Sequence, residues 1–258
     1  MRQTLSLPLF LVVLTLAGAW NGSESAPSDD ITTAQQLVEA MQARYAGKWY
    51  ATLTFTQTSI QHKKDGTADT TLWYEALEMP GKLRIDFDPI SEGNGFLFRA
   101  DTAYSIQNGV VAQSGPQVHS LLLLGFDVYF LPVETSIKKL EGLGFDLTKF
   151  REAQWQGRPV YVVGADEGDE TSPQFWIDRE NLYFVRQIQP VGPGGKASQE
   201  VQFNKYERAG GGWVSPEVLF YINGNLAFEE HYSEMKTGMT FDAALFDPAA
   251  WRTAKHWR

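Results

Sequence analysis

Residues 49–58 read Trp-Tyr-Ala-Thr-Leu-Thr-Phe-Thr-Gln-Thr, and this stretch decides the fold class. Its apolar residues alternate with polar ones, mostly threonines; the apolar set is Trp49, Ala51, Leu53 and Phe55. A period of two is that of a β-strand with one apolar and one polar face. The stretch therefore predicts a strand whose apolar face must be covered by further structure.

Similar segments follow toward the C-terminus, separated by turn signals. Met79-Pro80-Gly81 is one turn, and Asn108-Gly109 and Asn223-Gly224 are typical of tight hairpins. We expect one antiparallel sheet of about 10–11 strands, and a sheet of that size must curl or close. The predicted fold is mainly β with α: an unclosed antiparallel β-barrel covered by an N-terminal helix and short lid helices.

Two stretches depart from the period of two. Thr33 and Gln36 have the spacing of a capping box, and apolar residues then recur at helical spacing, which predicts a helix over 33–46. Residues 118–131 are too apolar for a surface helix and must be buried. We interpret this segment as a lid across the barrel mouth, with Gly125 and Pro132 as hinges. The alternative is that it is ordinary core.

The N-terminus has the pattern of an export signal. A basic end leads into an apolar run that closes on Ala17-Gly18-Ala19, so residues 1–19 are predicted to be a cleaved signal peptide. Ala26 is the alternative cleavage site, and an uncleaved anchor is disfavoured by the polar stretch 21–30. Residues 20–32 are expected to be a flexible segment and 33–258 a single β domain. No later segment has transmembrane length.

The composition excludes several classes of function. The formal net charge is −9, and no basic cluster is present, which argues against nucleic-acid binding. The chain has no cysteine, so an exported form cannot rely on disulfides, and thiolate nucleophiles and thiolate metal ligands are excluded. No cofactor and no metal site are predicted.

Catalytic motifs are absent from the sequence. It contains no Gly-x-Ser-x-Gly, no phosphate-binding P-loop and no His-Glu-x-x-His. Glu229-Glu230-His231 resembles an acid/base fragment, but on a strand Glu229 and His231 share one face while Glu230 points to the other. We therefore predict that the protein is not an enzyme. A periplasmic hydrolase would need a polar cleft with a nucleophile and a base in contact.

Several short motifs, taken in order, resemble the LolA-like family of periplasmic lipoprotein carriers. The helix that leads into Phe55-Thr56-Gln57 resembles the start of that family. The turn at residues 79–84, the stretch 174–186 and the closing Leu245-Phe246-Asp247-Pro248 are similar to later motifs. The resemblance covers about residues 33–250.

The resemblance implies an unclosed barrel, helices as a lid, and a cavity for acyl chains. The implied function is that of a periplasmic carrier, a chaperone that moves a lipidated protein or lipid cargo from an inner-membrane donor to an outer-membrane acceptor. We expect a monomer with no nucleic-acid partner. The alternative is a periplasmic sensor or regulatory domain that binds a lipidated signal and a membrane protein partner.

An acyl chain needs a dry and deformable pocket, because each buried methylene contributes about 0.8 kcal/mol. Family members often carry an arginine that latches the lid, where this sequence has Met79, an adaptable apolar contact. The predicted ligand-binding residues are apolar side chains at alternating positions and in the lid: Trp49, Leu53, Phe55, Trp73, Met79, Leu83, Ile85, Phe87, Phe98, Leu122, Phe126, Phe175 and Ile177.

Overall fold

The computed structural model describes residues 31–258, and an antiparallel sheet of thirteen strands dominates it. The predicted signal peptide 1–19 and most of the segment 20–32 lie outside the described residues. The strands, in their order across the sheet, are β6 (Val110–Pro116), β5 (Thr102–Gln107), β4 (Gly95–Arg99), β3 (Lys82–Phe87), β2 (Ala68–Glu78), β1 (Thr52–His62), β15 (Asn225–Thr237), β14 (Glu217–Ile222), β11 (Ala197–Asn204), β10 (Phe184–Val191), β9 (Gln174–Asp178), β8 (Arg158–Val163) and β7 (Phe150–Trp155).

The sheet stays open, as predicted. Its edge strands are β6 and β7, which do not pair with each other. The chain passes from one edge to the other through α2 (Ser120–Gly125), the 3-10 turn η2 (Asp127–Tyr129) and α3 (Val133–Gly142). A separate hairpin of β12 (Glu207–Ala209) and β13 (Gly212–Val214) lies between β11 and β14 in the chain. The short 3-10 turns are η1 (Ile90–Glu92), η3 (Pro193–Gly195) and η4 (Pro248–Ala250).

The sheet has more strands than the sequence predicted. Strand β6 is exposed along almost its whole length, so no buried face gives it an apolar period. Its pairing with β5 rests on main-chain hydrogen bonds. The Asn108-Gly109 hairpin signal predicted where this strand begins, but no apolar period indicated how far it extends along the edge.

The N-terminal helix forms where the capping signal predicted it. Helix α1 spans Ala34–Tyr45, and Thr33 Oγ1 accepts a hydrogen bond from the Gln36 N–H at 3.1 Å. Gln36 Oε1 accepts from the N–H of Thr32 at 2.9 Å, one residue earlier than the reciprocal bond of a capping box. The apolar face of α1, with Leu37 and Met41, is buried.

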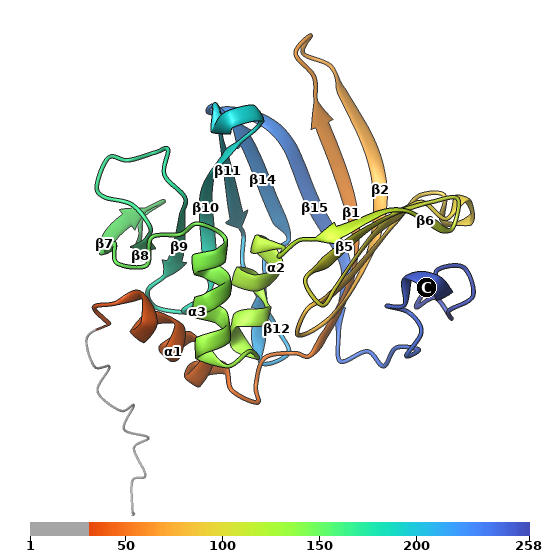
Figure 1. Cartoon of the computed structure of the whole chain (residues 1–258), viewed down its shortest axis with the longest axis horizontal. Coiled ribbons are helices and arrows are strands. Elements are labelled where there is room, and N and C mark those ends of the chain that lie inside the picture. The colour runs from red at the N-terminus through yellow and green to blue at the C-terminus, as the bar shows by residue number, and fades with distance from the viewer. Residues whose placement is uncertain (1–30) are drawn as a thin grey trace, which may run out of the picture. The chain divides into compact units, whose positions relative to one another are not determined.

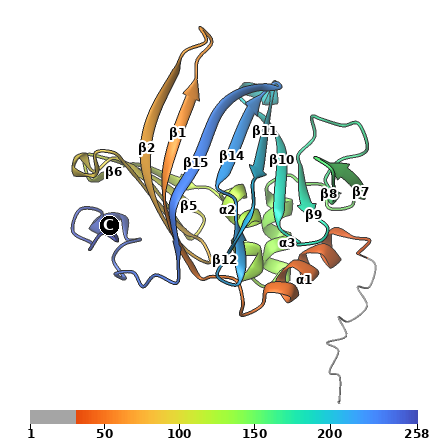
Figure 2. The same ribbon diagram turned by 180° about the vertical axis from the view of Figure 1, so that it is seen from behind.

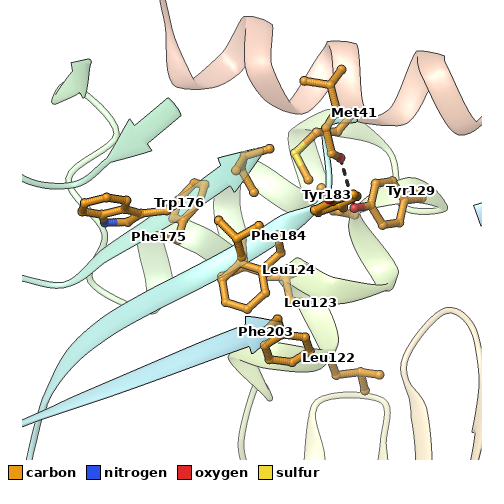
Figure 3. Close-up of a cluster of buried hydrophobic side chains, with 14 of the residues drawn as sticks. Met41, Leu122, Leu123, Leu124, Tyr129, Phe175, Trp176, Tyr183, Phe184 and Phe203 are labelled. Atoms are coloured by element: carbon orange, nitrogen blue, oxygen red, sulfur yellow. Dashed lines mark hydrogen bonds between the residues drawn. The ribbon is translucent and has the colours of Figure 1, made fainter. Parts of the chain in front are cut away.

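All three α-helices cover the same face of the sheet (Figures 1 and 2). Leu122, Leu123 and Leu124 of α2 point toward the sheet, where Phe184 and Phe203 lie (Figure 3). These five side chains belong to the main hydrophobic core. Leu123, Leu124 and Phe184 are almost completely buried, so the protein's own side chains fill the space between helix and sheet at these positions.

The opposite face carries a second, smaller core under the C-terminal segment. Leu245, Phe246 and Trp251 pack with Ala76 of β2, Leu97 of β4 and Ile106 of β5. Arg84 of β3 is 2% exposed and ties this segment down. Its guanidinium lies 3.8 Å from the centre of the Trp251 ring and donates to the main-chain oxygens of Leu245 and Trp251. The C-terminal segment thus replaces solvent on the outer face of β2–β5.

Candidate functional site

A cavity of about 550 Å³ lies between α2 and the sheet. Strands β1–β4, β11, β14 and β15 form one wall, and Leu121, Leu122 and Phe126 form the helical wall. A volume of this size is within the range of small-molecule sites, which are concave and mainly apolar. The remaining lining residues are Phe55, Gln61, Trp73, Glu75, Leu77, Leu83, Ile85, Phe96, Phe98, His119, Gln199, Phe203, Phe220, Ile222, Ala227, Phe228, Glu230 and Tyr232.

The apolar wall is aromatic and arises from strand alternation. Phe55 of β1 stacks on Tyr232 of β15, with ring centres 4.1 Å apart. Phe228 of β15 packs against Trp73 of β2 and Phe220 of β14 at 5.7 and 5.5 Å. Successive residues of a strand point to opposite faces, so each second residue of these strands reaches the cavity.

The structure places part of the predicted ligand-binding set on this cavity. Phe55, Trp73, Leu83, Ile85, Phe98, Leu122 and Phe126 line it. Whether these residues bind a ligand stays a prediction. The sequence argument missed Phe220 and Phe228, although both belong to segments that were recognised as strands, because it could not tell which strand faces meet at one cavity.

The other predicted residues do not line the cavity. Trp49 stacks on Tyr129 of η2, with ring centres 3.9 Å apart, at the end of the sheet where α1 lies. Phe175 and Ile177 of β9 are fully buried, and Phe145 packs edge-on against Phe175. Three more positions lie outside the cavity wall: Leu53 and Met79 are buried in the main core, and Phe87 packs on Trp73 and Phe96.

Polar groups also face the cavity, and burial changes their acidity. Loss of solvation raises the pKa of the Glu230 carboxyl to about 7. Burial, and secondarily the nearby Glu230, raises the pKa of Glu75 well above its usual range. Loss of solvation lowers the pKa of His119 to about 4, and His119 Nδ1 accepts the N–H of Leu122 at the start of α2. His119 is therefore neutral near pH 7.

The fragment Glu229-Glu230-His231 divides between the two faces, as strand alternation predicted. Glu230 lines the cavity, whereas Glu229 accepts from His62 at 2.7 Å and from His231 at 3.0 Å. Within residues 31–258, no group of three or more His, Cys, Asp or Glu side chains is placed to hold a metal ion. In the same part of the chain, no helix combines the length and the apolarity needed to cross a bilayer.

The helical wall is tied to the sheet at the turn between β2 and β3. The N–H of Gly81 donates to Asp127 Oδ1 at 2.8 Å, and Asp127 is 6% exposed. Lys139 of α3 forms an ion pair with Asp101 in the turn after β4. Met79 lies in the core beside this turn, and Arg84 points to the opposite face, so neither repeats an arginine latch.

Comparison with solved structures finds this arrangement in bacterial proteins of low sequence identity. A putative outer membrane lipoprotein-sorting protein domain from Vibrio parahaemolyticus is 16% identical, with a TM-score of 0.55 over 84% of this chain and 97% of that one. A LolA superfamily protein from Nitrosomonas europaea is 13% identical, with a TM-score of 0.51 over 83% and 97%. This chain has the LolA-like fold. The resemblance seen in the motifs is thereby confirmed for the fold.

The LolA-like fold is found again in a further structure. A DUF1329 family protein from Desulfovibrio piger is 14% identical, with a TM-score of 0.53 over 84% of this chain and 97% of that one. No family model and no curated protein matches the sequence. The comparisons therefore support the fold, and the function has to be argued from the cavity.

Proposed function

We propose that this protein is a periplasmic carrier that holds the acyl chain of a lipid or of a lipidated protein in the cavity under α2. The observation that carries the proposal is the 550 Å³ cavity with a mainly apolar and aromatic lining. Removing an acyl chain from water stabilises the complex by about 0.8 kcal/mol for each buried methylene. A hollow lined by aromatic rings supplies an apolar environment for the chain and does not require the ligand to have one particular shape.

The position of the cavity supports binding rather than mere loose packing. The part of the sheet near β9 and β10 is filled by Phe175 and Phe184, both fully buried. The hollow part lies over β1–β4, β14 and β15, on the same face of the same sheet. An apolar hollow of this size leaves its aromatic lining in contact with water, which is unfavourable unless an apolar ligand covers it.

Export and transfer complete the proposal. The N-terminal signal pattern supports export to the periplasm, where a carrier of this kind would receive its cargo from an inner-membrane donor and deliver it to an outer-membrane acceptor as a monomer. The helical wall formed by Leu121, Leu122 and Phe126 would act as the lid, opening for the cargo and closing over it.

The test is native mass spectrometry of the protein purified from a cell envelope without detergent, followed by organic extraction. A stoichiometric lipid or lipidated peptide is the expected result. In parallel, the delipidated protein is titrated with a neutral apolar fluorophore such as N-phenyl-1-naphthylamine. Ala227→Trp places a large side chain in the cavity and should weaken binding of the fluorophore about tenfold or more.

The matched control is Ala68→Trp, an exposed position at the start of β2 that does not line the cavity. This variant should bind the fluorophore as the unchanged protein does. The proposal is contradicted if the purified protein carries no amphiphile and the fluorophore does not bind, or if both tryptophan variants bind it equally well.

A further inference from the structure

Two strands each place one acidic residue among apolar ones on the cavity face, and the strand between them carries polar residues on that face. Glu75 lies between Trp73 and Leu77 on β2, and Glu230 lies between Phe228 and Tyr232 on β15. The strand between them is β1, where Gln57 shares the face of Phe55. We call Gln57, Glu75 and Glu230 the carboxyl site.

The register of the strands brings these three side chains together. Gln57 lies opposite Trp73 on one side and opposite Tyr232 on the other. Glu75 and Glu230 are each two residues from these partners, so both are diagonal neighbours of Gln57. Diagonal neighbours have Cβ atoms about 7–8 Å apart. Glu75 lies directly opposite Phe55 and Glu230 directly opposite Ser59, so the two glutamates approach Gln57 from opposite sides, and the charge of Glu230 is close enough to raise the pKa of Glu75.

The carboxyl site has more hydrogen-bond acceptors than donors. Gln57 is 1% exposed, its Nε2 donates to Ser59 Oγ at 2.8 Å, and its Oε1 is buried without a partner in the described chain. Glu230 accepts one hydrogen bond, from Tyr232 Oη at 2.5 Å. Among residues 31–258, no side chain or main-chain group donates to Glu75. Of these three residues, only Gln57 has a buried acceptor atom without a donor, at a cost of about 1–3 kcal/mol, whereas the Glu75 and Glu230 carboxyl groups face the cavity, where a ligand can donate to them.

The charges around the carboxyl site point to the same kind of ligand. Of the described residues that line the cavity, none is Lys or Arg, and His119 is neutral because its pKa is lowered to about 4. An anionic group would therefore meet two acidic side chains and no cation. An ammonium group would supply three N–H donors and would stabilise the ionised form of a carboxyl group, which burial alone disfavours.

We propose that the carboxyl site binds the primary amine end of an amphiphile whose apolar chain occupies the rest of the cavity, and that the cavity rejects an anionic end group. The inference rests on the proposed carrier function and names the chemical class of its ligand. On binding, the ammonium group donates to the carboxyl groups of Glu75 and Glu230; one of the two ionises beside it and releases its proton to solvent, while the other stays protonated.

The test compares three ligands with the same chain and different end groups. Dodecylamine, dodecanol and dodecanoate are titrated into the delipidated protein at pH 7.5 by calorimetry, each below its micellar concentration. We expect dodecylamine to bind about tenfold or more tightly than dodecanoate, with dodecanol between them. Equal or tighter binding of dodecanoate overturns the amine assignment while leaving the carrier proposal intact. Absence of binding by all three contradicts both proposals.

Variants separate the carboxyl site from charge elsewhere on the same strands. The double variant Glu75→Gln/Glu230→Gln should lose the preference for dodecylamine over dodecanol and still bind dodecanol. The control is Glu229→Gln, which removes a carboxylate from the next position of β15 on the opposite face and should keep the preference. If the double variant retains the full preference for the amine, the carboxyl site does not hold the amine.

Discussion

Glu230 shows what a single residue can indicate about function. An apolar side chain between Phe228 and Tyr232 would pack on the same wall, whereas this carboxyl is held protonated at near-neutral pH by loss of solvation. A group with a strongly changed pKa in a cavity is typical of a functional position. Burial of the ionisable Glu230 lowers stability at neutral pH, and the proposed binding of an amine beside it would offset this cost.

The pH dependence of stability follows from this carboxyl. An unfolded glutamate has a pKa of about 4.3, and folded Glu230 has a pKa of about 7, so between these values the folded state binds more protons than the unfolded state. Its contribution to stability therefore falls as the pH rises from about 4.3 to 7. We expect Glu230→Gln to be more stable than the unchanged protein at pH 8, by on the order of 1–3 kcal/mol, and similar to it at pH 4.

Thermal unfolding of both proteins between pH 4 and pH 8 checks this prediction. Glu229→Gln is again the control, because hydrogen bonds to His62 and His231 lower the pKa of Glu229 despite some loss of solvation. That variant should not gain stability at pH 8. Equal melting temperatures of Glu230→Gln and the unchanged protein at pH 8 would mean that the carboxyl is freely solvated in the cavity.

At the scale of single elements, the helical wall depends on a few contacts at its ends. The Gly81 N–H to Asp127 Oδ1 hydrogen bond joins η2 to the turn between β2 and β3. Burial raises the pKa of Asp127 to about 7, so this acceptor is partly protonated at neutral pH.

Removing this contact should loosen the helical wall without affecting the sheet. Asp127→Ala is expected to cost about 1–3 kcal/mol and to speed amide exchange in residues 118–131. Asp127→Asn keeps an acceptor for the Gly81 N–H and should behave much more like the unchanged protein. Hydrogen exchange followed by mass spectrometry distinguishes the three proteins. Equal exchange rates in Asp127→Ala would show that the wall is held by its leucines alone.

The C-terminal segment has a separate role, because it covers the face opposite the cavity. Trp251 is 3% exposed and stacks on the Arg84 guanidinium. We expect Trp251→Ala to cost about 3–5 kcal/mol, through lost burial and the lost cation–π contact. Binding of a neutral fluorophore by the folded variant should not change. If the variant is fully folded and still binds the fluorophore more weakly, the C-terminal segment influences the shape of the cavity through the sheet.

At the scale of the whole described chain, one sheet face serves two purposes. Around β9 and β10 it is packed by α1 and α3, and around β1–β4 it faces a hollow. Phe184 lies in the packed part and is fully buried, whereas Phe228 lies on the cavity wall. The same residue type should therefore affect stability in one part and binding in the other.

This division predicts different effects for two phenylalanine substitutions. Phe184→Ala should destabilise the fold by about 3–5 kcal/mol, the usual effect of emptying a packed site. Phe228→Ala should cost much less, because its ring is already in contact with a void, but it should weaken binding of the neutral fluorophore. Chemical denaturation and fluorophore titration of both variants provide the comparison. Equal destabilisation would contradict the presence of a hollow region.

The sequence by itself was enough to predict individual helices and strands and, through the order of several short motifs, the fold. Thr33 and the apolar period after it define α1, and the alternation from Leu53 to Phe55 defines β1, because capping and strand alternation act over a few residues. The strong apolarity of 118–131 likewise predicted a buried segment. The exposed edge strand β6 was harder to predict, since no buried face imposes a pattern on it.

Only the tertiary structure decided which apolar positions surround a cavity. Phe55 and Phe175 have the same kind of environment in their sequences, yet Phe55 lines the hollow and Phe175 lies beneath Phe145 in the packed core. The carboxyl site was hidden for the same reason: Gln57, Glu75 and Glu230 meet through strand pairing between residues far apart in the chain. Local patterns determine which face of its strand a side chain lies on. Whether helices cover that face or leave a cavity over it depends on segments that are distant in the sequence.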